Sequence, residues 1–235
     1  MKKGGRLQTF LFNNRRTFRP VILLDPAKEK LFQIDLTSKN LLLTEGIYTD
    51  IERFYEFISD HIAYNGAAYA IGGYDELRVV YNRSRVFDAT SVGEEPRRRH
   101  LGTDIWGKAR SPVFCPLKGT VHSFAMNNND GDYGATIILS HQFDDDIFYT
   151  LYGHLSADDL QIKKGVTVNA GEHFCNFGQP HENGNWPPHL HFQVIADIGA
   201  NEGDYPGVCS EKERDHYLEN CPDPDYILQL NRYCI

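Results

Sequence analysis

The segment PPHLHFQV, residues 187–194, combines two histidines with an alternating run of apolar residues. This alternation predicts a β-strand, in which residues i and i+2 point to the same face. His189 and His191 would then direct both imidazoles toward one site. One imidazole can bind a metal ion while its neighbour handles a proton, as zinc hydrolases require. A His-x-His pair alone also occurs on surfaces or behind a ligand shell, so it needs support from the rest of the chain.

Two upstream segments supply further groups that bind metals. RHLGTD, residues 99–104, places the imidazole of His100 four residues before the carboxylate of Asp104, and LYGHLS, residues 151–156, adds His154. Zinc accepts imidazole nitrogen and carboxylate oxygen, and a catalytic zinc site keeps three protein ligands and one open position. The chain can therefore provide two histidines and one aspartate as ligands. Two histidines are then left to act as a general base or to donate hydrogen bonds to an oxyanion.

The overall composition is that of an ordinary soluble protein. The 235 residues are enough for one domain with substantial extensions. The formal net charge of −8 argues against nucleic acid as a partner, because such binding depends on clustered Lys and Arg. No run approaches the roughly 18–20 apolar residues of a membrane span, and no apolar signal-peptide core follows the basic N-terminus. We expect a cytoplasmic protein without stable membrane insertion, exported only if a leader was removed; the oligomeric state stays open.

The cysteines are odd in number, widely spaced and without a Cys-x-x-Cys pair, which indicates reduced, structural thiols. They are Cys115, Cys175, Cys209, Cys221 and Cys234. The spacing of Cys209 and Cys221 would also allow a disulfide.

Residues 1–90 are predicted to form an N-terminal extension with one amphipathic helix. From Ile51 onward apolar residues recur at i, i+3, i+4, i+7 and i+11, with Asp50 as N-cap and Asn65-Gly66 as the stop. Short apolar runs before this helix favour loops and one or two short strands. Residues 76–81 indicate a further strand.

The chain beyond His100 has the pattern of short strands and tight turns. Strands are predicted at 119–126, 135–139 and 147–152, with turns at 127–131 and 144–146. The sequence thus predicts an α+β, mostly antiparallel β, fold. Its β-rich domain would cover residues 91–198, with a C-terminal extension, residues 199–235, packed on that domain.

Taken in order, HLGTD (100–104), YGHLS (152–156) and HLHF (189–192) resemble the lysostaphin/LytM-type zinc metallopeptidases over roughly residues 97–195. The resemblance implies a β-rich peptidase domain that binds one Zn²⁺ per chain through His100, Asp104 and His191. It implies that His154 and His189 form the catalytic pair, without saying which is the general base. It also implies a metalloendopeptidase that hydrolyses an amide bond in a peptide. Members of this family tend to act on peptidoglycan, so the resemblance favours a peptidoglycan-type peptide.

The loop GQPHENGNWPP, residues 178–188, departs from the family, whose members usually have a Gly/Ser/Thr-rich loop there. Two prolines fix their own φ and restrict the preceding residue, so we expect a narrower, reshaped cleft. Two alternatives to a peptidase stay open: a zinc hydrolase acting on a cytoplasmic small molecule, and a non-catalytic binding module on the same fold. The remaining histidines are expected to be structural or exposed; they are His61, His122, His141, His173, His181 and His216.

Overall fold

An eight-stranded sheet with the order β1-β2-β4-β11-β8-β7-β6-β9 forms the centre of the computed structural model, which describes residues 2–235. The strands are β1 (Leu31–Ile34), β2 (Tyr69–Gly72), β4 (Thr103–Trp106), β6 (Gly119–Asn127), β7 (Gly134–Phe143), β8 (Asp146–Leu155), β9 (Thr167–Val168) and β11 (His189–Ile195). Neighbouring strands are antiparallel except for the parallel pair β1–β2. The mostly antiparallel fold predicted from the sequence is therefore confirmed.

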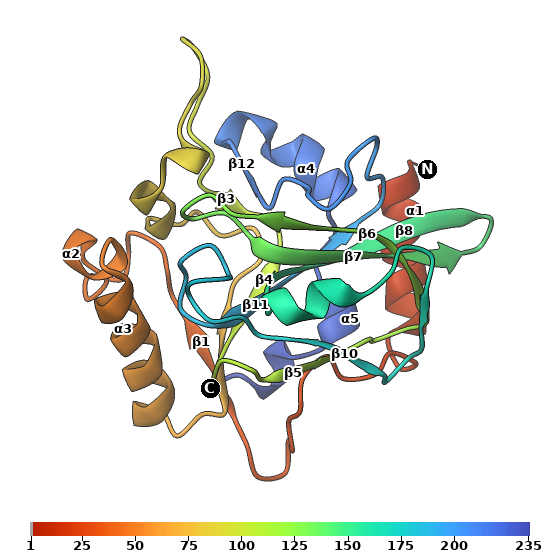
Figure 1. Ribbon diagram of the computed structural model, residues 1–235, viewed down its shortest axis with the longest axis horizontal. Coiled ribbons are helices and arrows are strands. Elements are labelled where there is room, and N and C mark those ends of the chain that lie inside the picture. The colour runs from red at the N-terminus through yellow and green to blue at the C-terminus, as the bar shows by residue number, and fades with distance from the viewer. Residues whose placement is uncertain (1) are drawn as a thin grey trace.

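Smaller elements surround this sheet. Two further two-stranded sheets pair β5 (Pro112–Phe114) with β10 (His173–Asn176), and β3 (Arg99–His100) with β12 (Val208–Cys209). The α-helices are α1 (Lys3–Asn14), α2 (Glu45–Tyr48), α3 (Ile51–Tyr64), α4 (Arg214–Asn220) and α5 (Asp225–Leu228). Short 3-10 turns are η1 (Val80–Arg83), η2 (Arg85–Phe87), η3 (Ala157–Gln161), η4 (Glu211–Glu213) and η5 (Asn231–Tyr233). Figure 1 shows α2 and α3 at one end of the molecule and α1 at the other.

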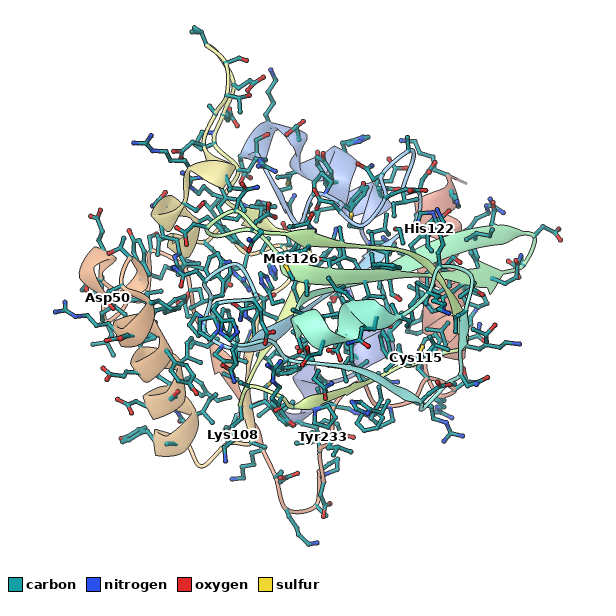
Figure 2. All side chains as sticks on the ribbon, viewed as in Figure 1. Asp50, Lys108, Cys115, His122, Met126 and Tyr233 are labelled. Atoms are coloured by element: carbon teal, nitrogen blue, oxygen red, sulfur yellow. The ribbon has the colours of Figure 1, made fainter. Side chains whose placement is uncertain are left out.

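The helix α3 forms as the sequence predicts. The Asp50 side chain accepts hydrogen bonds from the backbone N–H groups of Glu52 and Arg53, which satisfies two donors at the start of the helix. Asp50 lies on the outside of the molecule (Figure 2). The helix stops before Gly66, whose φ of +59° is the left-handed conformation that glycine adopts without strain.

The N-terminal extension contains more helices than the one we expected. Both α1 and α2 are present in addition to α3, and β1 and β2 lengthen the main sheet. In α1 the pair Leu7 and Leu11 is fully buried in the main core. Tertiary packing thus stabilises a short helix whose local signals are weak. The proposed division of the chain at residues 90 and 198 stays a prediction.

The strand predicted at residues 76–81 is wrong. Asp75 has φ of 56°, and only Leu77 makes an isolated bridge, to Arg99, before the chain enters η1. The apolar run that suggested a strand is interrupted by Arg78, whose side chain is turned inward and buried. The buried guanidinium contacts Gly73 and Glu76 of the same turn, in addition to Asp104.

The C-terminal residues pack on the main core. Ile227, Leu228 and Leu230 are buried in the same apolar cluster as residues of β7 and β8. The five cysteines are all unpaired, and four of them are buried. Within residues 2–235, no helix is both long and apolar enough to cross a membrane.

His141 on β7 is a buried structural histidine away from the three sequence motifs. Its Nδ1 lies 3.0 Å from the carbonyl oxygen of Lys118, and its Nε2 lies 2.7 Å from Oγ1 of Thr150. These contacts suit a neutral imidazole, with Nδ1–H donating to the carbonyl and Nε2 accepting from the hydroxyl. Burial lowers the pKa of His141 to about 4.

We predict that His141 makes the protein less stable in acid. Its pKa is lower in the folded state, so the unfolded chain binds more protons and stability falls as pH drops through about 6.5 toward the folded value. The loss amounts to about 2 kcal/mol between roughly pH 7 and pH 5. Urea unfolding of the wild type and of His141→Gln at both pH values measures it, since glutamine can make both hydrogen bonds but does not titrate. Equal pH dependence in the two proteins would contradict the assignment.

Candidate metal centre and active site

The sheet register brings two of the three expected ligands face to face. His191 on β11 is directly opposite Asp104 on β4 in the antiparallel pair. Side chains at paired positions point to the same face, with Cβ atoms about 5 Å apart. His100 arrives from β3, which is joined to β4 by Leu101-Gly102. A Cβ on Gly102 would lie 2.5 Å from Cε1 of His191, so glycine there leaves room for the imidazole.

These three side chains form a compact triangle of donor atoms. Nε2 of His100 lies 2.9 Å from Nδ1 of His191 and 3.2 Å from Oδ1 of Asp104. Nδ1 of His191 lies 3.0 Å from the same oxygen. Tetrahedral coordination with bonds of about 2.1 Å separates ligand atoms by roughly 3.4 Å. Two imidazole nitrogens and a carboxylate oxygen, all buried and converging at this spacing, fit a zinc ion after a small outward adjustment.

The outer nitrogen of each histidine in the triangle faces a hydrogen-bond acceptor. Nδ1 of His100 lies 2.9 Å from the carbonyl oxygen of Gly73, and Nε2 of His191 lies 2.9 Å from Oε1 of Gln193. Each outer nitrogen therefore carries the proton, and the inner nitrogen keeps its lone pair for a metal. Burial, together with nearby Arg78, lowers the pKa of His100 to about 4.

Asp104 is ionised in this environment. Burial by itself would raise its pKa, but His100 and Arg78 hold the pKa of this carboxyl well below its ordinary value. One oxygen, Oδ1, faces the two histidines, while Oδ2 accepts a hydrogen bond of 2.5 Å from Arg78. Arg78 was not among the residues expected at the site. Its one sequence signal is a charged residue inside the apolar run of residues 77–81.

His154 and His189 lie side by side at the same site. Their rings stack with centroids 4.0 Å apart. Nδ1 of each ring contacts a backbone carbonyl at 2.8 Å, that of Asn183 for His154 and that of Pro187 for His189. Nε2 of each is therefore the unprotonated nitrogen. Burial lowers the pKa of His189 to about 4 and that of His154 well below its ordinary value, so both rings are neutral near pH 7.

A β-bulge aims the side chain of His154. The partners of Ala135 and Ile137 on β7 are Leu155 and Tyr152, so β8 carries one extra residue at this point. His154 has φ of 61°, in the left-handed region that few residues other than glycine adopt. Bulges beside active sites commonly re-aim a side chain in this way. A regular strand would have placed His154 differently, and the sequence motif gave no sign of the bulge.

A cavity of about 220 Å³ opens onto these groups. Its wall includes both histidines of the stacked pair and residues of η1 and η2. The aromatic residues among its lining are Tyr81, Phe87, Trp106, Tyr133, Trp186 and Tyr205. The ring of Trp106 stacks on that of His189 at 3.8 Å and 17°. In the loop that we expected to narrow the cleft, Trp186 lines the cavity. Pro187 contributes its backbone carbonyl oxygen, which accepts a hydrogen bond from Nδ1–H of His189.

Comparison with known proteins agrees with this geometry. Residues 98–202 match the model of Peptidase family M23. The match covers somewhat less than half of the 235 residues. It confirms the resemblance to the lysostaphin/LytM-type metallopeptidases, and Zn²⁺ is the cofactor that the family and the His-Asp-His set indicate. The five motif residues all fall within the matched segment.

The chain spans about a third of the first curated relative that it matches, and only part of each similar structure. An L-Ala–D-Glu endopeptidase of Bacillus subtilis (strain 168) is 30% identical over 132 residues, which cover 54% of this chain and 38% of that protein. A zinc-containing peptidase of Vibrio cholerae is 28% identical with a TM-score of 0.35, covering 44% of this chain and 28% of that one. The catalytic domain of lysostaphin from Staphylococcus simulans is 21% identical with a TM-score of 0.35, covering 51% and 80%.

We predict that the protein binds one zinc ion. Elemental analysis after reconstitution and desalting should give one equivalent per chain, and chelation should lower the melting temperature because the ion binds the folded state preferentially. His141→Gln, which changes a buried histidine outside the triangle, should keep the full equivalent. Retention of no zinc, or of two ions per chain, would contradict a single three-ligand site.

Proposed function

We propose that this protein is a zinc metalloendopeptidase that hydrolyses an amide bond in a peptidoglycan-type peptide. One observation carries the proposal: two neutral, stacked histidines lie beside a three-residue metal set on the wall of one cavity. The match of residues 98–202 to Peptidase family M23 and the similarity to an L-Ala–D-Glu endopeptidase support the choice of bond.

His100, Asp104 and His191 would hold the metal through the donor atoms that converge in the triangle. Zinc, when bound, supplies Lewis-acid chemistry, which polarises a scissile carbonyl and activates water for attack. The protein contributes the fixed positions of its ligands. Because the two outer imidazole nitrogens are hydrogen-bonded to Gly73 and Gln193, neither ring has to change tautomer to bind the ion.

His154 and His189 would handle the proton and the developing negative charge. Their Nε2 atoms are unprotonated, so either one can accept a proton from the attacking water. Once protonated, an imidazole donates from Nε2 to the oxyanion or to the leaving amine. The carbonyls of Asn183 and Pro187 keep both rings oriented through this cycle, since they accept from Nδ1–H in the neutral and in the charged form.

The surroundings favour a partly enclosed substrate segment. Six aromatic side chains line the cavity beside the reacting groups, and they would shield a bound peptide from part of the solvent. A small-molecule hydrolase with the same metal has no specific feature in its favour. The non-catalytic alternative is disfavoured because all five chemically relevant side chains meet at one site.

A pair of variants at the His-x-His motif tests this function. His191→Ala should lose zinc, because it removes one of three protein ligands. His189→Ala should keep zinc and lose turnover by roughly a hundred-fold to ten-thousand-fold, the usual contribution of a general acid or base. Bound zinc and cleavage of an L-Ala–γ-D-Glu peptide are measured for both variants, with a peptide of L-residues alone for comparison.

His181→Ala is the matched control, since His181 is an exposed histidine of the neighbouring loop. It should keep both zinc and turnover. Equal zinc retention in the two motif variants would refute the assignment of ligand and catalyst. Failure of the zinc-loaded wild type to cleave any peptide of the panel would refute the peptidase.

A further inference from the structure

Arg78 is a buried arginine that comes from outside the segment matched by the M23 family. It precedes the matched residues 98–202 by 20 positions, on the connection between β2 and η1. Its side chain is 1% exposed. A guanidinium stays charged in proteins, so burying one is costly unless carboxylates and hydrogen-bond acceptors surround it. The groups that balance the buried charge of Arg78 therefore indicate what this side chain does.

The guanidinium spans the back of the metal triangle. Its NH1 donates to Oδ2 of Asp104 at 2.5 Å, and its Nε donates to Oε2 of Glu76 at 2.7 Å. NH2 donates at 3.3 Å to the carbonyl oxygen of Gly73, which also accepts from Nδ1 of His100 at 2.9 Å. One short segment, residues 73–78, thus contacts two of the three expected ligands.

The backbone of β2 is shaped to admit this side chain. Gly72 on β2 pairs with Asp104 on β4, directly beside the carboxylate. A Cβ at position 72 would lie 2.6 Å from NH2 of Arg78. Any larger residue there would displace the guanidinium from its place. The extension therefore provides both the arginine and the space that the arginine occupies.

We propose that Arg78 is a positioning residue for the metal centre: it holds Asp104 so that Oδ1 faces His100 and His191 while Oδ2 is occupied. The inference rests on the zinc site of the proposed function, and it assigns part of that site's outer shell to the N-terminal extension. A carboxylate restrained through one oxygen offers the other as a single, fixed ligand atom. Without Arg78, Asp104 could rotate, and the site would lose its preorganised geometry.

Zinc affinity tests this role independently of catalysis. The dissociation constant of Zn²⁺ is measured by competition with a chromophoric chelator for the wild type, Arg78→Gln and Arg78→Lys. Arg78→Gln should weaken zinc binding by about 10-fold to 100-fold, the usual effect of removing an outer-shell partner. Arg78→Lys should fall between, because one ammonium cannot reach Asp104, Glu76 and Gly73 together.

The matched control is Arg98→Gln. Arg98 is an ion-paired arginine of the same region that contacts Asp88 and Asn82 and none of the expected ligands. It should keep wild-type affinity. Gly72→Ala provides a second perturbation, since it displaces the guanidinium while leaving its charge in place, and it should weaken zinc binding as Arg78→Lys does. All variants are first compared by circular dichroism and thermal unfolding without metal.

The outcomes separate this inference from the proposed function. Wild-type zinc affinity in Arg78→Gln or, if that variant does not fold, in both Arg78→Lys and Gly72→Ala would overturn the positioning role, whatever the peptidase activity. Weakened zinc binding in a protein that cleaves no peptide would uphold the role of Arg78 and reject the peptidase. A loss of affinity as large in Arg98→Gln would show a general effect of charge and also overturn it.

Discussion

The buried carboxylate of Asp104 is the constraint on which the site depends. A carboxylate that is only 3% exposed is tolerated with opposite charge and hydrogen-bonding groups close by, and Arg78, His100 and His191 supply these to Asp104. Because β4 lies between β2 and β11, Arg78 approaches from one side and His191 from the other. Figure 1 shows β4 and β11 crossing the centre of the molecule. The surrounding sheet therefore positions a polar centre inside an apolar core, and a bound cation would complete its charge balance.

Four histidines at this centre follow one rule. Each has one ring nitrogen directed to an oxygen acceptor: the carbonyls of Gly73, Asn183 and Pro187, and the side chain of Gln193. Each remaining nitrogen is thereby left with its lone pair. In the triangle these are Nε2 of His100 and Nδ1 of His191, the atoms that would bind zinc, and in the stacked pair they are the two Nε2 atoms. The loop of residues 178–188 therefore orients both stacked rings through the carbonyls of Asn183 and Pro187, and it also shapes the cavity through Trp186.

The β-rich fold and the five residues that meet at this centre could be picked out from the sequence because their signals are local, while the roles of the five residues stay a prediction. His-x-His on an alternating run, an i, i+4 His/Asp pair and the N-cap of α3 each depend on a few neighbouring residues. Arg78, the bulge at His154 and the helix α1 depend on contacts between distant segments. In the sequence, Arg78 cannot be distinguished from a surface arginine, because its partner Asp104 is 26 residues away. The bulge depends on the pairing of β7 with β8 and not on either strand alone.

The most direct test of the account is the position of zinc in a crystal of the metal-loaded protein, located by anomalous scattering at the zinc edge. The account predicts one peak per chain, bonded to Nε2 of His100, Oδ1 of Asp104 and Nδ1 of His191, with Oδ2 of Asp104 still held by Arg78. A peak elsewhere, a ligand set that includes His154 or His189, or an Asp104 carboxylate turned away from Arg78 would contradict it.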